Sequence, residues 1–155
     1  GRMNVFDDLP FRIIMDFAHN PDGMRRICEF VDAQTVAGRK VLAFSGIIDR
    51  RDETIKNVGR AVAGHFDFYF CKDYVRTEEK ATRSVTDILL AGLLESGVKP
   101  DNTSVKTSGK QVIFEIFDSC RQGDLLVMLT GHTEKNLLAG YIREYAAQLT
   151  DGQSR

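Results

Sequence analysis

The sequence has little cysteine, no long apolar run and almost no net charge, and each shortage excludes a class of protein. Its 3 Cys in 155 residues, without CxxC or CxxH spacing, argue against a disulfide framework and a zinc site, so we expect small buried thiols. No apolar run approaches the ~20 residues of a membrane-spanning helix, and no signal-peptide pattern opens the chain. A net charge of -1 gives no electrostatic case for nucleic acid or an anionic membrane as a partner. We therefore expect a protein of the reducing cytoplasm.

Short apolar segments alternate with amphipathic ones along almost the whole chain. Strands are predicted over residues 11–15, 41–44, 66–71, 102–106 and 125–129. Helices are predicted over 21–31, 86–94 and 134–149, and around the apolar positions of 55–63 and 112–120, with a frayed end from Thr150. The last helix should turn six residues to the core: Leu137, Leu138, Tyr141, Ile142, Tyr145 and Leu149. This alternation favours an α/β fold in one domain of residues 1–155, a Rossmann-like three-layer α/β/α sandwich with a mostly parallel sheet.

Polar side chains gather where the predicted strands end. Asp16, His19 and Asn20 follow the first strand, and Pro21 then suits the first turn of a helix. Polar loops also follow three other predicted strands. They contain Ser45, Gly46 and 49–52 after the strand at 41–44, Lys72, Asp73, Arg76 and Thr77 after the strand at 66–71, and 130–135 after the strand at 125–129. Ligands of open α/β sheets bind at the carboxyl ends of strands. The four loops together therefore indicate one polar ligand site.

Each of these residues also has a plain structural interpretation. Asp16 could cap a helix or simply end its strand, and Asp52 could cap the next helix. His19 could be an exposed loop histidine. Glu134 could lie at the start of the last helix, where the positive end of the helix dipole stabilises a carboxylate. The joint arrangement is harder to explain in this way than any single member.

No motif in the chain completes a nucleotide site or a catalytic site. The sequence has neither a GxxxxGKS/T P-loop nor a GxGxxG turn after a strand. It also has no GxSxG elbow and no HExxH pair. A catalytic domain of this kind would supply only half of a site, and we assign no catalytic residue to it.

Three motifs in this order resemble the C-terminal domain of the Mur ligase family. They are Gly1-Arg2-Met3-Asn4-Val5-Phe6, Asp16-Phe17-Ala18-His19-Asn20-Pro21 and Asp49-Arg50-Arg51-Asp52. The resemblance covers essentially the whole chain and is greatest to the ligase half of cyanophycin synthetases. It implies an ATP-dependent enzyme that forms amide bonds through an acyl phosphate. It also implies a separate central domain that carries the P-loop and most of the Mg²⁺ ligands.

The resemblance implies a role for individual residues of this chain. Arg2 would approach the ATP phosphates, Asp16 would accept hydrogen bonds from the ribose, and His19 and Asn20 would lie near the phosphates. The implied substrate-binding residues are Asp49, Arg50, Asp73, Arg76 and Glu134, with no metal ligand in this domain. Arg76 would clamp the carboxylate of the incoming amino acid, and Glu134 would pair with a cationic end, as on arginine.

The sequence departs from ligases that add diaminopimelate, and alternatives stay open. Those ligases carry Asp-Asn-Pro-Arg where this chain has Asp73-Tyr74-Val75-Arg76, which puts diaminopimelate in doubt. A different Mur ligase, adding an amino acid to a peptidoglycan precursor, is one alternative. A non-catalytic α/β module that binds a small anionic ligand is another. An upstream P-loop would distinguish the ligase from the module, and the ligase domain alone should be inactive. A contact of His132 with ligand is left open.

Overall fold

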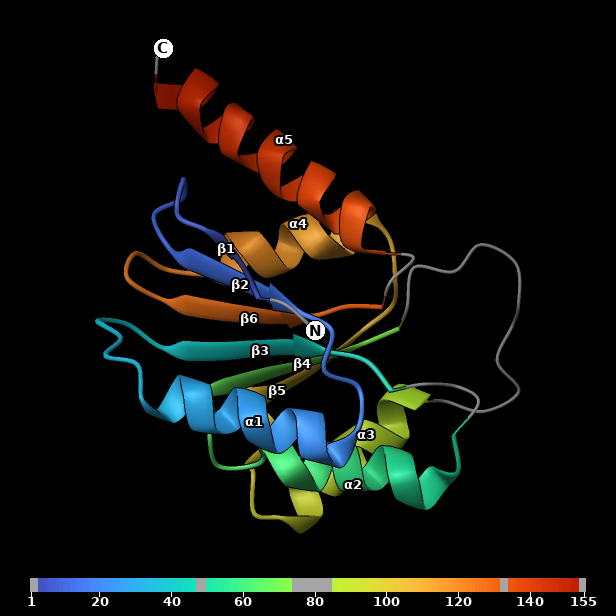
Figure 1. The fold of residues 1–155 in the computed structure, drawn as a ribbon. Coiled ribbons are helices and arrows are strands. Elements are labelled where there is room, and N and C mark those ends of the chain that lie inside the picture. Colours follow the sequence, from blue (N-terminus) through green and yellow to red (C-terminus); the bar gives the residue numbers. More distant parts are fainter. Residues whose placement is uncertain (1–2, 47–49, 74–84, 132–133, 154–155) are drawn as a thin grey trace.

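A central sheet with helices on both faces forms the molecule (Figure 1). The structure is a computed structural model that describes residues 3–46, 50–73, 85–131 and 134–153. Within these residues the sheet has six strands in the order β1-β2-β6-β3-β4-β5. The strands are β1 (Asn4–Phe6), β2 (Arg12–Asp16), β3 (Lys40–Phe44), β4 (Phe68–Lys72), β5 (Thr103–Lys106) and β6 (Leu125–Leu129). All pairs are parallel except β1 with β2, so the predicted mostly parallel sheet is confirmed.

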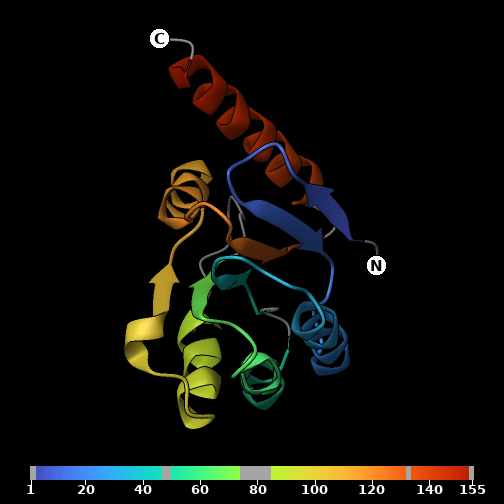
Figure 2. The same cartoon turned by 90° about the vertical axis from the view of Figure 1, so that its left-hand side faces the viewer.

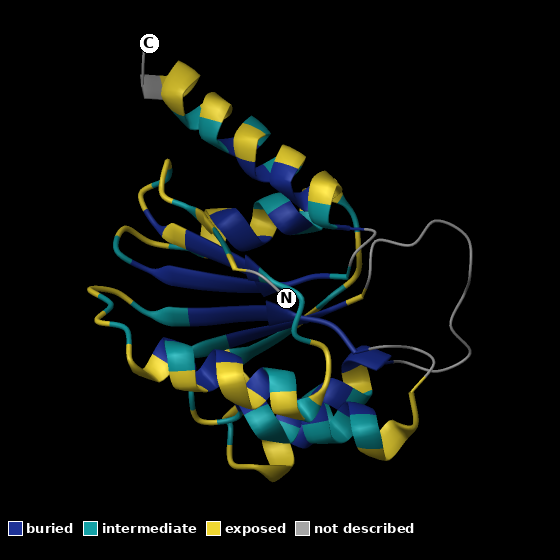
Figure 3. Ribbon diagram, viewed as in Figure 1, coloured by how far each residue is buried: buried dark blue, intermediate teal, exposed yellow. Residues whose placement is uncertain are grey.

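The central strands are apolar on both faces because helices cover both. All five residues of β6 are buried, as are the last four of β3 and β4. Alternate residues of each strand enter two separate cores, as strand geometry requires. Figure 3 shows the buried strands between helices that are exposed only on their outer sides.

Three helices pack on one face of the sheet, α1 (Pro21–Asp32), α2 (Asp52–Val62) and α3 (Val85–Glu95). The predicted inner face of α1 is confirmed, since its buried residues are Met24, Ile27, Cys28 and Val31. Asn20 caps α1 and Pro21 lies in its first turn. A short 3₁₀ turn, η1 (Pro100–Asn102), precedes β5. Figure 2 shows these helices beneath the sheet from a second direction.

The other face is covered by α4 (Lys110–Ser119) and α5 (Lys135–Gln153). In α5 the burial of Leu138, Ile142 and Tyr145 confirms the predicted inner face, but Leu137 is 39% exposed and that prediction was wrong. The predicted end of this helix at residue 149 was wrong, because α5 continues to Gln153. No helix in the described ranges has the length and apolar character needed to cross a membrane.

Helices α2 and α3 touch through backbone at two glycines. A Cβ atom on Gly92 would lie 2.2 Å from the carbonyl oxygen of Lys56, and one on Gly59 would lie 2.5 Å from the oxygen of Leu89. Both distances are far shorter than a normal van der Waals contact. The absence of a side chain at these positions lets the two helices lie unusually close together.

The first strand, β1, was not predicted. It has three residues and runs antiparallel along the edge of the sheet, with Asn4 opposite Met15 and Phe6 opposite Ile13. Its three residues, Asn4–Phe6, are too few to show the period-two pattern of a strand, and Val5 is 53% exposed. Its pairing with β2 stabilises it rather than its own composition.

Candidate functional site

The carboxyl ends of four neighbouring strands bring the predicted site together. β2, β6, β3 and β4 are adjacent and parallel, so the residues that end or follow them lie along one edge of the sheet. These residues are Asp16, Thr130, Ser45 and Lys72. The alternation of the chain therefore does place the polar ends of separate strands side by side.

Asp16 ends β2 and is half-buried. Its Oδ1 accepts a hydrogen bond of 2.9 Å from the Ala18 backbone N–H, and its carbonyl oxygen accepts another of 2.9 Å from Thr130 N. A carboxylate has about four lone-pair sites, and this turn uses one of them. Asp16 is thus held in place by its neighbours while retaining acceptor capacity.

His19 and Asn20 follow on the same loop and are exposed. The side-chain oxygen of Asn20 accepts a 2.8 Å hydrogen bond from Gly23 N at the start of α1. Asn20 therefore has a structural role as a helix cap, and its contact with phosphate stays a prediction. The Nδ1 atom of His19 lies 3.1 Å from the Phe17 carbonyl oxygen, which can only accept a hydrogen bond. This contact assigns the hydrogen to Nδ1 and leaves Nε2 for a ligand.

Thr130, Ser45 and Lys72 form a row of buried polar side chains on the face covered by α4 and α5. Each follows a residue of that core by two positions: Thr130 follows Met128, Ser45 follows Ala43, and Lys72 follows Phe70. Because strand side chains alternate, the three share this face. Ala43 is opposite Met128, and Phe44 is opposite Cys71, so the registers also align the three across the strands. Asp16, two residues after Ile14, belongs to the opposite face.

Lys72 was predicted to begin a charged loop, and this was wrong. It is the last residue of β4 and is 1% exposed. Its Nζ donates a 3.3 Å hydrogen bond to Ser45 Oγ. Loss of solvation lowers the pKa of Lys72, while the charges of Glu134 and then Asp73 act to raise it. A buried lysine is the strongest polar feature that sequence reasoning missed.

Glu134 directly precedes α5 and is 2% exposed. Its Oε2 lies 3.5 Å from Thr130 Oγ1, and its carbonyl oxygen accepts from Leu138 N at 2.9 Å. The structure therefore brings Glu134 to the same end of the row as Thr130. An acidic and a basic side chain are thus buried at one edge of the sheet.

The remaining predicted residues are less completely placed. Asp73 is exposed beside Lys72; desolvation raises its pKa, and Lys72 opposes this. Arg50 is exposed just before α2. Asp52 is the first residue of α2 rather than its cap, which is Arg51. Arg2, Asp49, Arg76 and His132 lie outside the described residues.

A cation–π contact links the loop after β2 to the start of α5. The Nζ of Lys135 lies 5.3 Å from the centroid of the Phe17 ring. Phe17 follows Met15 by two residues and so faces the α5 side. This contact holds the loop bearing His19 beside the helix that begins after Glu134.

The three cysteines are not candidates for chemistry. Cys28 and Cys71 are buried and Cys120 is half-buried, in agreement with the predicted small apolar role. Burial raises the pKa of each thiol to about 12, so the nucleophilic thiolate is scarce at neutral pH.

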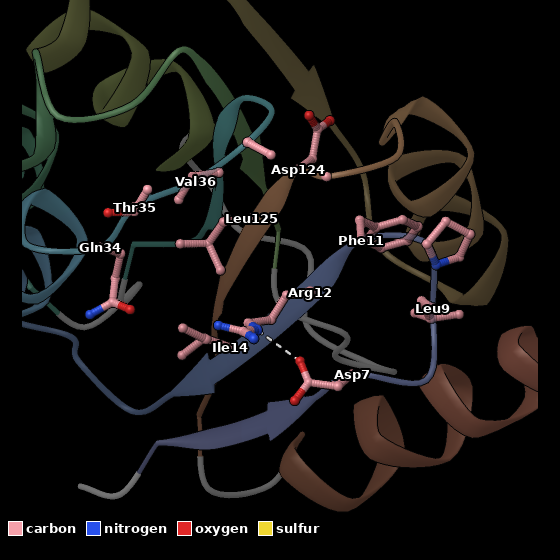
Figure 4. Close-up of a pocket in the computed structure, with 13 residues that line it drawn as sticks. Asp7, Leu9, Phe11, Arg12, Ile14, Gln34, Thr35, Val36, Asp124 and Leu125 are labelled. Atoms are coloured by element: carbon pink, nitrogen blue, oxygen red, sulfur yellow. Dashed lines mark hydrogen bonds and ion pairs between the residues drawn. The ribbon is translucent and has the colours of Figure 1, made fainter.

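A cavity of about 300 Å³ lies at the amino ends of the parallel strands, opposite the carboxyl ends that carry the predicted site (Figure 4). It opens beside the first residues of β2 and β6, where Arg12 Nε pairs with Asp7 Oδ1 at 2.7 Å. Asp124 also lines it, and this buried carboxylate is paired with Arg39 at 2.8 Å. The cavity is therefore separate from the strand ends that carry the predicted site.

The described residues form a three-layer α/β domain with carboxylates, an imidazole and a lysine at or after the carboxyl ends of its strands, and the sequence has no P-loop. Residues 1–132 match the family described as "Mur ligase, glutamate ligase domain", and the chain belongs to this family. The resemblance seen in the sequence is thereby confirmed.

Its similar curated proteins include two kinds of ligase. The chain is 28% identical over 128 residues to a cyanophycin synthetase from Crocosphaera subtropica, covering 83% of this chain and 14% of that protein. It is 29% identical over 126 residues to a UDP-N-acetylmuramoyl-L-alanyl-D-glutamate–2,6-diaminopimelate ligase from Halalkalibacterium halodurans, covering 80% of this chain and 24% of that protein. The chain thus spans less than a quarter of either relative.

Solved structures of low identity share the fold. A domain assigned to a UDP-N-acetylmuramate:L-alanyl-gamma-D-glutamyl-diaminopimelate ligase of Haemophilus ducreyi matches with a TM-score of 0.64 at 13% identity, covering 96% of this chain and 99% of that one. The MurF ligase of Thermotoga maritima, in complex with ADP, matches with a TM-score of 0.63 at 13% identity, covering 96% of this chain and 32% of that one. The Rossmann-like architecture is therefore the fold of Mur ligase C-terminal domains.

Proposed function

We propose that this chain is the C-terminal domain of an ATP-dependent ligase that forms amide bonds, acting most like cyanophycin synthetase. The observation that carries the proposal is that Asp16, Lys72 and Glu134 end or follow three parallel strands of one sheet, β2, β4 and β6, at the carboxyl ends of those strands. The similarity to cyanophycin synthetase and the absence of a P-loop from the sequence support it. In this proposal a central domain of the same polypeptide supplies the P-loop.

The nucleotide binds at the carboxyl end of β2, on the face of the sheet that α1 covers. Asp16 lies on that face, is oriented by its turn, and can accept hydrogen bonds from ribose hydroxyls. His19 is exposed on the same loop with Nε2 available toward phosphate, and Arg2 approaches the phosphates from the preceding segment. ATP supplies the phosphoryl group, and Mg²⁺ is held mainly by the central domain.

The incoming amino acid meets the substrate loops that follow β3, β4 and β6. Arg76 and Arg50 are suited to a carboxylate, since guanidinium groups bind carboxylates in a bidentate manner. Asp49, Asp73 and Glu134 are suited to the amine and to a cationic side chain such as that of arginine. The charges of Glu134 and Asp73 both act to raise the pKa of Lys72, which its burial lowers.

The chemistry requires closure of this domain over the central one. A substrate carboxylate accepts the γ-phosphoryl group to become an acyl phosphate, and the amine then attacks the acyl carbon and releases phosphate. Water would hydrolyse the acyl phosphate, so the reacting groups must be enclosed and aligned. The domain alone therefore should make no amide bond.

The nucleotide role is tested with Asp16→Ala in the full-length ligase. Removal of the carboxylate should raise the KM for ATP by about ten-fold, the size expected for a lost charged hydrogen-bond acceptor. Asp22→Ala is the matched control, because Asp22 is an exposed carboxylate of α1 paired only on the surface with Arg25. An unchanged KM for ATP in Asp16→Ala would remove the ribose role.

The substrate role is tested with Arg76→Ala and a screen of arginine, lysine and glutamate. The KM for the amino acid should rise about ten-fold or more while the KM for ATP stays constant, because a bidentate carboxylate clamp is lost. Arg26→Ala, an exposed arginine on α1, is the control. The family match and the 29% identity to a diaminopimelate ligase favour peptidoglycan precursor ligation as the second candidate, which activity on a UDP-linked acceptor would reveal.

A further inference from the structure

The cavity at the amino ends of the parallel strands has no part in the proposed function. Its volume of about 300 Å³ is at the lower end of the range for small-molecule pockets, which suits a ligand the size of an amino acid. It opens beside the first residues of β2 and β6, whereas the nucleotide and substrate residues end or follow these strands. Occupation of this cavity is therefore independent of the proposed function.

Backbone hydrogen bonds hold the rim of the cavity in place. Gly123 N donates to the carbonyl oxygen of Pro10 at 3.0 Å, and Gly38 N donates to that of Gly123 at 2.9 Å. Arg12 N donates to the carbonyl oxygen of Asp124, also at 3.0 Å. The segments that lead into β2, β3 and β6 are thus joined around the opening. A ligand would therefore meet a preformed cavity and would require little ordering of the protein.

One charged group of the lining is already satisfied. The carboxylate of Asp124 accepts four hydrogen bonds, three from Arg39 and one from the backbone N–H of Arg121. These contacts use its lone-pair sites, so Asp124 forms a wall of the cavity and not a group that binds a ligand. The other charged lining residues are Arg12 and Asp7, whose charges cancel.

Arg12 and Asp7 present a cation and an anion side by side (Figure 4). Arg12 Nε donates to Asp7 Oδ1 at 2.7 Å, and the two side chains are 54% and 61% exposed. Within the described part of the chain this contact uses only Nε and one carboxylate oxygen, which leaves the terminal guanidinium nitrogens and Asp7 Oδ2 for a ligand. An exposed ion pair contributes little to stability, so both groups can adjust to a ligand at small cost.

We propose that this cavity binds a free α-amino acid as its zwitterion. The carboxylate of the ligand meets the terminal nitrogens of Arg12 in a bidentate manner, and its ammonium group meets Asp7 Oδ2. Both charged groups of an α-amino acid are bonded to the same carbon atom, so they reach neighbouring side chains together. A site without net charge does not concentrate simple anions or cations. The half-buried side chains of Leu9 and Val36 complete the lining and favour an aliphatic amino acid such as leucine.

The test is the binding of leucine to the 155-residue chain, followed by the NMR signals of the backbone amides. Leucine should bind with a Kd of about 1 mM, an affinity typical of so small a ligand, and should shift the signals of Thr35 and Gly123 at the cavity. Isocaproate lacks the ammonium group and leucinamide lacks the carboxylate, so each should bind at least about ten-fold more weakly. Equal binding of either probe would overturn the zwitterion, and the absence of shifts at about 20 mM leucine would overturn the site.

Variants of the ion pair locate the binding. Arg12→Gln and Asp7→Asn should each raise the Kd for leucine about ten-fold, because each removes a charge-assisted hydrogen bond. Both side chains are exposed, so both variants should keep the wild-type amide spectrum away from the cavity. Arg25→Gln is the matched control, since Arg25 is an exposed arginine of α1 paired with Asp22, and it should leave the Kd unchanged. Wild-type affinity in Arg12→Gln, or an equal loss in Arg25→Gln, would refute the inference whether or not the full-length ligase forms amide bonds.

Discussion

The close crossing of α2 and α3 yields the sharpest stability prediction, Gly92→Ala. The new Cβ would lie 2.2 Å from the carbonyl oxygen of Lys56, and this oxygen belongs to the backbone of the facing helix. No side-chain rotation can relieve such a contact. The helices must separate by about 1 Å to reach an ordinary van der Waals distance. We therefore expect the substitution to disturb the packing of both helices on the sheet.

The magnitude follows from two opposing effects. Overpacking of a core costs about 1–3 kcal/mol, and a backbone contact belongs at the upper end. Alanine regains up to about 1 kcal/mol of helix propensity relative to glycine. The net loss in the free energy of unfolding should be about 2 kcal/mol. For a domain of this size that lowers the Tm by about 4–8 °C.

Gly140→Ala is the matched control for the same exchange. Gly140 lies in α5, is exposed, and has no atom within 4 Å of the position of an added Cβ. Only the propensity effect remains, so this variant should gain about 0.5–1 kcal/mol. Thermal and urea unfolding of the 155-residue chain measures both. A Gly92→Ala variant as stable as the wild type would refute the argument from close approach.

Further predictions concern the cap of α1 and a buried ion pair. Asn20→Ala should lower stability by about 1 kcal/mol in urea unfolding because Gly23 N loses its acceptor, and Asn20→Asp should retain most of it. Burial raises the pKa of Asp124, but hydrogen bonds from Arg39 and from the Arg121 backbone outweigh this and leave it below its ordinary value. Its contribution to stability is thus present above about pH 5 and lost as the pH falls below about 4. Asp124→Asn should flatten that acid-induced loss in unfolding curves, and an unchanged pH slope would exclude the pair as its source.

The helices and central strands were predictable because burial leaves a periodic pattern. Met24, Ile27 and Val31 recur at helical spacing, and β6 is a continuous apolar run, so each pattern indicates its element. β1 lacks such a pattern, since its pairing partner rather than its composition stabilises it. The exposure of Leu137 could not be predicted either, because the exact rotation of α5 depends on its packing with α4.

The candidate site was predictable in its location but not in its interior. Strand ends identify the edge, and Asp16 and Glu134 are present there. Lys72 donates to Ser45, and the charge of Glu134 acts to raise its pKa, yet these two residues are 27 and 62 residues away along the chain. A hydrophobic pattern of period two or 3.6 carries no information about contacts between residues so far apart in the sequence. The capping role of Asn20 was likewise hidden, since an amide before a proline fits both a cap and a ligand contact.

The antiparallel edge strand also has a mechanical consequence. Because Asn4 is opposite Met15, the chain joins the sheet next to Asp16, and β4 lies four strands further along. With strands about 4.8 Å apart, Asp16 is about 5 Å and Lys72 about 19 Å from a pivot on β1. A rigid rotation of about 10° there would move them by about 1 Å and 3 Å respectively. A rotation of the sheet about β1 would therefore displace the end of β4 about four times as far as the end of β2.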